Sequence, residues 1–217
     1  MHQFKFCGVE AIDLTKIGGA VVKDLTKWSG MVDGDEDLTT YTETDPSSRA
    51  TVTSSKVTIS GLVLSEDLHV SKDFGANNIN GFTVLFETNT TTGATGAVCA
   101  AAFSGNLVNR TEAATTDCFV QLNPELIILA RGNAVVYVQY SCSVDTIYYL
   151  KLYRADGSDT IYLYIYSDSA RTTLLDTLSV SGFGTATRYR YFQPVVSLAE
   201  EGSTIYNGYV QNFNLDI

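Results

Sequence analysis

The sequence is short of proline, tryptophan and positive charge. Its 217 residues include 3 Pro and 1 Trp, and 14 Lys and Arg stand against 24 Asp and Glu, giving a net charge of −10. So few cations argue against a nucleic-acid partner, because binding to nucleic acid depends on neutralising phosphates. They also argue against an anionic membrane surface as partner. Hydrophobic residues make up 45% of the chain, which is enough to build a core and excludes global disorder.

Two kinds of hydrophobic segment are missing as well. No run of about 18 apolar residues occurs, so insertion into a membrane is not expected. The N-terminus lacks a basic start followed by an apolar stretch, so we expect synthesis in the cytoplasm without a secretory signal peptide.

The four cysteines form no CxxC motif, which argues against zinc and thiol–disulfide redox sites. They are Cys7, Cys99, Cys118 and Cys142, each among apolar or small residues. Two disulfides are one interpretation. Small unpaired thiols are the favoured one, since a core of this size needs no covalent crosslinks.

From residue 50 onward, the sequence predicts strand after strand. Thr and Tyr are abundant, and clusters such as Asn80-Gly81 and Asp156-Gly157 mark turns. Strands separated by short turns, with no helix between them, indicate an all-β antiparallel sandwich or barrel. The predicted strands are 50–54, 56–64, 67–74, 82–90, 96–104, 118–122, 125–131, 134–142, 147–155, 160–167, 174–181, 187–199 and 204–216.

The N-terminal residues differ from the rest, and we interpret residues 1–30 as an arm or docking segment and residues 31–217 as one domain. Apolar residues from Val9 to Trp28 roughly follow a helical period, which Gly18-Gly19 interrupts. An extended arm with two short strands fits equally well. Trp28 is expected to fasten this arm to the core.

Catalytic motifs are absent. His69 is expected to be half exposed on a strand, on the face opposite Leu68 and Val70, and His2 lies near the terminus; no GxSxG sequence accompanies either. Glycosidases need two carboxylates across a cleft. The adjacent pairs Glu66-Asp67 and Glu200-Glu201 would point to opposite faces of a strand, so solvated loop charges are the favoured interpretation. We therefore predict that the protein is not an enzyme.

Residues 31–46 hold six acids and no base. Asp33, Asp35 and Asp37 alternate as in a calcium-binding loop, but Leu38 and Thr44 replace the Gly and Glu that an EF-hand needs. A solvated acidic loop is favoured over a looser calcium site. Calcium is thus the one cofactor that the sequence leaves open.

The abundance of tyrosine is the most informative feature of the composition. In residues 160–166, Ile161, Leu163 and Ile165 alternate with tyrosines, which predicts a buried aliphatic face and an outward tyrosine face. The contact candidates are Tyr149, Tyr153, Tyr162, Tyr164 and Tyr166. Three roles stay open for them: covering the sheet, forming a protein interface, or stacking against sugar rings.

Three segments carry a resemblance to a known family. They are Tyr148 to Gly157, which ends in an Arg-Ala-Asp-Gly turn, the alternating strand Ile161 to Ser167, and Gly208 to Leu215, which reads GYVQNFNL. About residues 40–217 resemble the concanavalin A-like lectin/glucanase jelly roll, in its laminin-G-like branch. The segment from Trp28 to Gly75 is similar to versions found in tailed-phage proteins.

The resemblance implies two curved antiparallel sheets and a face that often binds glycans, sometimes beside calcium. The paired glutamates of the catalytic branch are missing, and no functional residue is carried over. Two functions follow as expectations. The first is a non-enzymatic virion component, such as a capsid decoration, head fibre or tail appendage, that docks to capsid or tail proteins through residues 1–30 and forms a homo-oligomer. The alternative is a carbohydrate-binding, lectin-like adhesin module that recognises a cell-surface glycan.

Overall fold

A computed structural model describes residues 16–17, 20–21, 36–107, 109–132 and 136–217 of the chain. The chain divides into two compact units, Met1–Gly34 and Asp35–Ile217, and the second contains both large sheets. In the first unit, strands β1 (Lys16–Ile17) and β2 (Ala20–Val21) pair in antiparallel fashion. This agrees with the two-strand interpretation of the arm. Trp28, His2, Cys7 and the predicted boundary at residue 30 lie outside the described residues.

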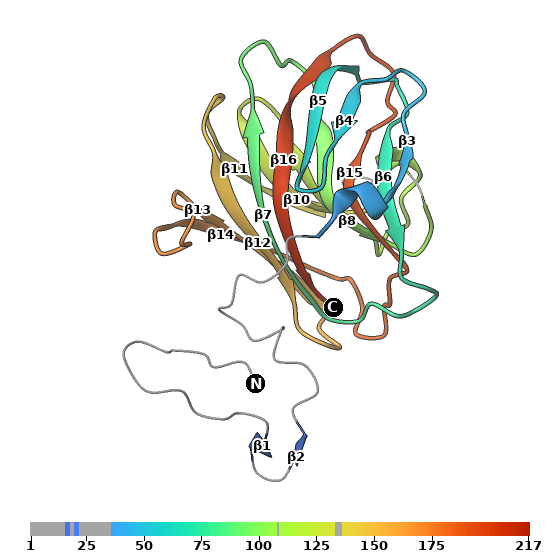
Figure 1. Cartoon of the computed structure of the whole chain (residues 1–217), viewed down its shortest axis with the longest axis vertical. Coiled ribbons are helices and arrows are strands. Elements are labelled where there is room, and N and C mark those ends of the chain that lie inside the picture. Colours follow the sequence, from blue (N-terminus) through green and yellow to red (C-terminus); the bar gives the residue numbers. More distant parts are fainter. Residues whose placement is uncertain (1–15, 18–19, 22–35, 108, 133–135) are drawn as a thin grey trace. The chain divides into compact units, whose positions relative to one another are not determined.

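The second unit is a sandwich of two seven-stranded antiparallel sheets (Figure 1). In the order in which the strands pair, sheet I consists of β11 (Val136–Ser141), β10 (Leu126–Arg131), β9 (Cys118–Leu122), β8 (Val98–Ser104), β15 (Tyr191–Val196), β6 (His69–Asp73) and β3 (Thr42–Thr44). Sheet II consists of β14 (Leu174–Ser181), β13 (Thr160–Tyr166), β12 (Tyr148–Arg154), β7 (Phe82–Thr90), β16 (Ile205–Asp216), β5 (Lys56–Val63) and β4 (Ala50–Val52). Figure 1 shows the long strand β16 running between β7 and β5.

Each strand predicted from residue 50 onward is present, as β4 to β16. The sequence missed β3, which has only three residues, all exposed, and therefore shows no alternation. Two short 3-10 helices, η2 (Leu38–Thr40) and η3 (Arg110–Glu112), lie in the connections. None of the helices in the described part of the chain is long and apolar enough to span a membrane.

The core lies between the two sheets and is built by alternation. In β13, Ile161, Leu163 and Ile165 are fully buried, whereas the tyrosines between them are half-buried. Aromatic rings fill the middle of the core, and the ring centroids of Phe82 and Phe103 lie 3.8 Å apart. The expected inward aliphatic face and outward tyrosine face are thus confirmed.

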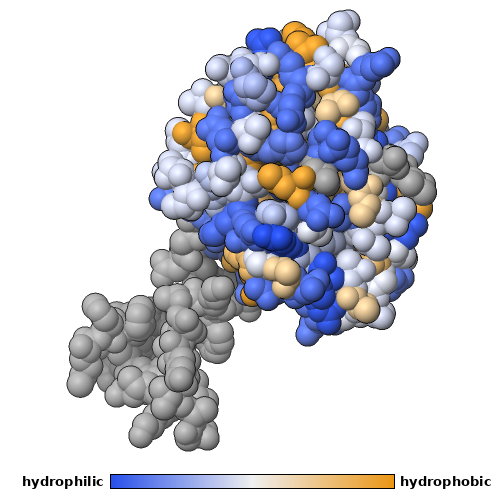
Figure 2. All heavy atoms as spheres, turned by 90° about the vertical axis from the view of Figure 1, so that its right-hand side faces the viewer, coloured by the Kyte–Doolittle hydropathy of each residue, from blue (hydrophilic) through white to orange (hydrophobic). Residues whose placement is uncertain are grey.

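The outer face of sheet I carries a second, smaller cluster of buried residues. It consists of Ala97, Cys99, Ala102, Phe119, Val196 and Leu198, with Leu64 and Ala113 packed against it. The connections that hold Arg110 and Glu200 help to enclose this cluster, because Ala113 and Leu198 belong to the same connections. Figure 2 views the side that carries β3 and β6 in Figure 1. That side is mostly hydrophilic, with hydrophobic residues scattered singly.

Among the described cysteines, Cys99 and Cys118 are buried free thiols, as favoured from the sequence. Cys142 is also free but only half-buried. Burial raises the pKa of the Cys99 thiol to about 12, which makes it a poor nucleophile at neutral pH.

Candidate functional site: a tyrosine face on sheet II

The five candidate tyrosines lie together on the outer face of sheet II. Strands β12 and β13 pair so that Tyr149 is opposite Tyr166 and Tyr153 is opposite Tyr162. Between these two pairs, Lys151 lies opposite Tyr164. We call this group, the five tyrosines with Lys151, the tyrosine face.

The register of one hairpin creates the tyrosine face. A strand places every second side chain on the same side, so two strands that alternate in phase bring two rows of side chains together. The turn between β12 and β13 fixes that phase, with Gly157 at a φ of +66° and the Ser158 amide donating to the Ala155 carbonyl. A slip of one residue would turn the tyrosines into the core.

The rings and the lysine contact one another. The ring centroids of Tyr162 and Tyr164 are 6.2 Å apart and the planes are inclined by 22°. The Lys151 ammonium lies 5.6 Å from the ring centroids of both Tyr153 and Tyr164, within the range of cation–π attraction. Partial burial is the main reason why the pKa of Tyr164 is raised, so its hydroxyl stays protonated and can donate a hydrogen bond.

The tyrosine face continues across the sheet into a polar row. From β12 toward β5, Tyr149 pairs with Glu87, Glu87 with Gln211, and Gln211 with Lys56. The Gln211 amide donates to the Glu87 carboxylate at 2.8 Å. The Lys56 ammonium lies 3.8 Å from the ring centroid of Tyr209. The face therefore offers rings, hydrogen-bonding groups and cations side by side.

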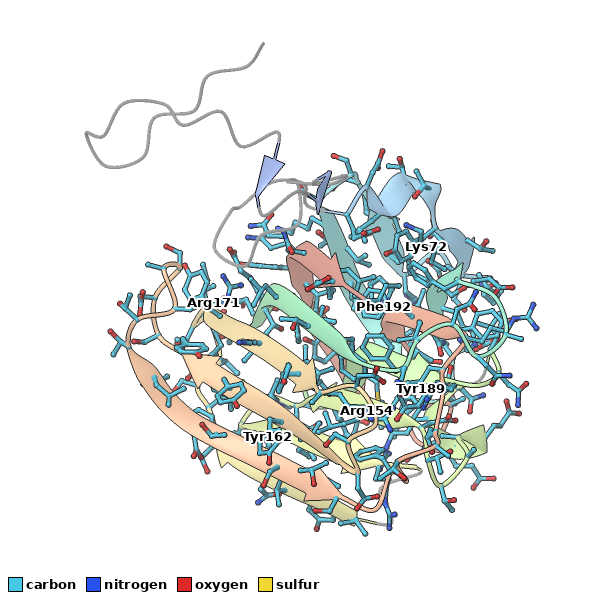
Figure 3. The ribbon with its side chains drawn as sticks, turned by 90° about the horizontal axis from the view of Figure 1, so that it is seen from below. Lys72, Arg154, Tyr162, Arg171, Tyr189 and Phe192 are labelled. Atoms are coloured by element: carbon cyan, nitrogen blue, oxygen red, sulfur yellow. The ribbon has the colours of Figure 1, made fainter. Side chains whose placement is uncertain are left out.

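Arg171 reaches this face from the connection between β13 and β14. Its guanidinium donates to the backbone carbonyls of Leu150 at 3.4 Å and Phe86 at 3.3 Å. Burial lowers its pKa, and the nearby charge of Glu87 opposes that shift. In Figure 3, Arg171 lies near one end of β12 and β13, and Tyr162 lies farther along them. Sequence reasoning missed Arg171 because its position beside Tyr149 and Tyr166 arises from a turn.

Of the three predicted calcium ligands, the structure describes only Asp37. Asp33 and Asp35 lie outside the described part of the chain. The Asp37 carboxylate instead caps η2, accepting hydrogen bonds from the Thr39 amide at 3.1 Å and the Thr39 hydroxyl at 2.6 Å. No cluster of three metal-ligating side chains occurs among the described residues.

The structure corrects the prediction that His69 is half exposed. Its face is the expected one, but the residue is only 7% exposed. His69 Nε2 lies 2.6 Å from an Asp67 carboxylate oxygen, and Nδ1 lies 3.3 Å from the Gln193 amide nitrogen. The Gln193 carbonyl oxygen accepts from the Ser104 hydroxyl at 3.0 Å. This buried network crosses three strands of sheet I, and sequence reasoning missed it because its members are far apart in the chain.

Of the adjacent acids predicted to be solvated loop charges, all four lie in loops and Asp67 and Glu201 are exposed, but Glu66 and Glu200 form ion pairs. Glu66 forms a bidentate ion pair with Arg49, at 2.8 and 2.9 Å. Hydrogen bonds from Arg49 are the main cause that lowers the pKa of Glu66 to about 2. Glu200 pairs with Arg110 at 2.5 Å. These carboxylates hold connections in place because each finds a cation distant in sequence.

The two sheets and their strand order define a concanavalin A-like jelly roll, as the sequence resemblance implied. No sequence family and no curated protein matches the chain. Solved structures do match in fold.

Three similar solved structures belong to proteins of different kinds. Arcelin-5, a lectin-like defence protein from Phaseolus vulgaris, has a TM-score of 0.55 and 10% identity, with 84% of this chain and 93% of that chain covered. The VIP36 exoplasmic/lumenal domain, in a form bound to Ca²⁺ and Man3GlcNAc, has a TM-score of 0.54 and 10% identity, covering 83% and 86%. The family 7 alginate lyase A1-II′, with a TM-score of 0.55 and 9% identity over 84% and 96%, is an enzyme. At these identities the likeness establishes the fold, which lectins and enzymes share.

Proposed function

We propose that this protein is a carbohydrate-binding, lectin-like module and that the tyrosine face is its contact surface. The observation that carries the proposal is the gathering of five half-buried tyrosines and a lysine on the outer face of one sheet. Tyrosine rings present apolar faces that suit the C–H face of a pyranose, and their hydroxyls reach sugar hydroxyl groups.

Two features support glycan contact over simple coverage of the sheet. The five candidate tyrosines of β12 and β13 are only half-buried, whereas the outer face of sheet I carries a cluster of buried side chains. Polar side chains that bond sugar hydroxyls, Glu87 and Gln211, follow directly in the same row. The fold is also that of lectins, which makes the proposal consistent with its relatives.

The proposal is tested with the full chain on a glycan array, with and without calcium. Binding should be found, and Tyr162→Ala combined with Tyr164→Ala should weaken it about tenfold or more, since two aromatic contacts are lost. Tyr137→Ala is the matched control, because Tyr137 is a 54% exposed tyrosine on strand β11 of the other sheet.

Circular dichroism shows whether each variant is folded. An array without hits in either condition would contradict the proposal. Equal loss in the control variant would show that the tyrosine face has no special role.

The role expected first from the sequence, a virion component docking through residues 1–30, stays a prediction. It is tested by looking for the chain in purified phage particles and by deleting residues 1–30. Incorporation that survives the deletion would remove the docking role of the arm. A virion protein that binds glycans would satisfy both expectations.

The prediction that the protein is not an enzyme also stays open to test, because an alginate lyase shares the fold. Incubating the full chain with each saccharide that it binds, and analysing the products by mass spectrometry, would reveal any cleavage. Intact saccharides are expected.

A further inference from the structure

The cations of the described residues fall into distinct groups. Four of them pair with carboxylates: Arg49 with Glu66, Lys72 with Glu36, Arg110 with Glu200 and Arg190 with Asp73. In a chain with 24 acids and 14 bases, such pairing is the expected state of a cation.

Other cations bond backbone carbonyls or lie against rings, and three of these are on the outer face of sheet II. None of the ion pairs in the described part of the chain includes Lys56, Lys151 or Arg171. Lys151 and Lys56 lie against tyrosine rings, and Arg171 bonds only to backbone carbonyls, at 3.3 to 3.4 Å. The acids near these cations are Glu87, Asp216 and, in the same connection as Arg171, Asp168; Glu87 accepts a hydrogen bond from Gln211. Three cations thus stand beside three acids here, whereas the whole chain has 14 bases and 24 acids.

The backbone at Arg171 adds a separate observation. Its φ is +52°, a left-handed conformation that side chains other than glycine and asparagine rarely adopt. Six other described residues besides glycine share this conformation, so the φ defines the shape of the turn and does not by itself mark a site. Here the connection is held by Asp168, whose carboxylate accepts from the Thr172 and Thr173 amides. The turn places the Arg171 guanidinium at the backbone carbonyls of Leu150 and Phe86, where it interacts electrostatically with Glu87, Tyr166 and Tyr149.

We propose that the saccharide bound by the tyrosine face is acidic, a chain of uronic acid residues whose carboxylates are met by Lys151 and Arg171 while its rings lie on the tyrosines. The inference rests on the proposed function and deepens it. Each cation stands beside its own tyrosines: Lys151 beside Tyr153 and Tyr164, and Arg171 beside Tyr149 and Tyr166. Two such subsites along one pair of strands suit an extended polymer. An arginine fork also matches a carboxylate in both geometry and charge.

The test uses the full chain and three uronic acid probes, which are oligogalacturonate, oligomannuronate and hyaluronan oligosaccharide. Each is compared with its carboxyl-reduced counterpart, which keeps the sugar backbone and loses the charge. At least one probe should bind, its reduced form should bind about tenfold more weakly or worse, and binding should weaken as salt rises from about 0.05 to 0.5 M. Heparin is included because tighter binding to it than to every uronate probe would indicate a sulfate site and overturn the proposal.

Two variants test whether Lys151 and Arg171 bind the uronate carboxylates. Lys151→Gln and Arg171→Gly should each weaken uronate binding about fivefold to tenfold, a larger loss than either causes for the reduced probe. Glycine accepts the φ of residue 171, so Arg171→Gly keeps the turn. Arg171→Lys should retain part of the binding, because lysine keeps the charge but loses the bidentate fork. Arg188→Gln is the matched control, since Arg188 is a cation outside ion pairs that bonds backbone carbonyls away from this face.

The failures of the two proposals are distinguishable. Suppose that neutral saccharides bind, that Tyr162→Ala combined with Tyr164→Ala abolishes this binding, and that the uronate probes do not bind. In that case the proposed glycan binding stands, and the proposed specificity for acidic saccharides is wrong. If uronates bind but Lys151→Gln and Arg171→Gly match the control, the assigned cations are wrong. If no saccharide binds at all, both proposals fail.

Discussion

The outer faces of the two sheets differ in residue type and in burial. On sheet I, small side chains and one phenylalanine are enclosed by connections, and the polar residues His69, Gln193 and Ser104 bond to one another. On sheet II, tyrosines and long cationic side chains remain half-buried and bond little beyond the face. One outer face is therefore closed by packing, and the other stays partly exposed.

The largest expected effect separates the two faces by stability. Phe119→Ala, on the enclosed face of sheet I, should lower the free energy of unfolding by about 3–4 kcal/mol, because a fully buried ring leaves a cavity. Tyr164→Ala on sheet II should cost about 1 kcal/mol, since its ring is only half-buried. Urea unfolding of both variants measures the difference. Equal losses would show that the tyrosines are packing residues, and Phe119→Leu, expected to lose less, checks that the cavity is the cause.

A smaller effect concerns the connections that enclose sheet I. Glu200→Gln should destabilise the protein by about 1–2 kcal/mol, because it leaves the buried Arg110 guanidinium without its carboxylate. Its neighbour Glu201 forms no ion pair in the described part of the chain, so Glu201→Gln is a matched control with little expected change. Thermal unfolding of the two variants compares them. If both melt alike, the Arg110–Glu200 pair contributes nothing to that enclosure.

The connection between β5 and β6, which joins the two sheets, holds Glu66, and the stability that this carboxylate contributes should be lost at acid pH. Arg49 lowers the pKa of Glu66 from 4.5 to about 2. A lowered carboxyl pKa contributes stability that is fully present above pH 4.5 and is lost as the pH falls toward 2. The difference in unfolding free energy between the wild type and Glu66→Gln should therefore be constant from about pH 5 to 7 and shrink below pH 4.5. A difference that does not change with pH would contradict this assignment.

The smallest expected effect is on the face assigned to the ligand. Lys151→Gln should change the unfolding free energy by less than about 0.5 kcal/mol, because Lys151 is only half-buried and forms no ion pair in the described residues. The same variant should weaken binding to a uronate probe. Guanidinium unfolding measured beside the binding assay separates the two quantities. A large loss of stability would show that Lys151 serves packing, as the residues on the enclosed face of sheet I do.

Local pattern was sufficient for strands β4 to β16, which carry alternation or turn signals, but not for β3, whose three residues are all exposed. The tyrosine face was also predictable in part: the alternation in β13 placed Tyr162, Tyr164 and Tyr166 together without further information. The pairing with Tyr149, Tyr153 and Lys151 depends on the register of a hairpin, which the Asp156-Gly157 turn makes plausible but does not prove.

The errors share one physical cause. His69 looked half exposed because its strand alternates, yet its environment comes from Gln193, 124 positions away, and from Asp67. Glu66 and Glu200 looked solvated because their partners, Arg49 and Arg110, are distant in sequence. Burial and pairing of a polar side chain depend on neighbours brought by the fold, and a local pattern contains no record of them.

The sequence by itself determined the strands, the side of each strand that enters the core, and the shortage of positive charge, because these depend on residue types and on spacing along one segment. Only the tertiary structure decided which outer face would be closed, which cations would lack a carboxylate, and that Arg171 would stand beside the tyrosines. Those outcomes depend on distances between segments remote in sequence, and folding alone sets such distances.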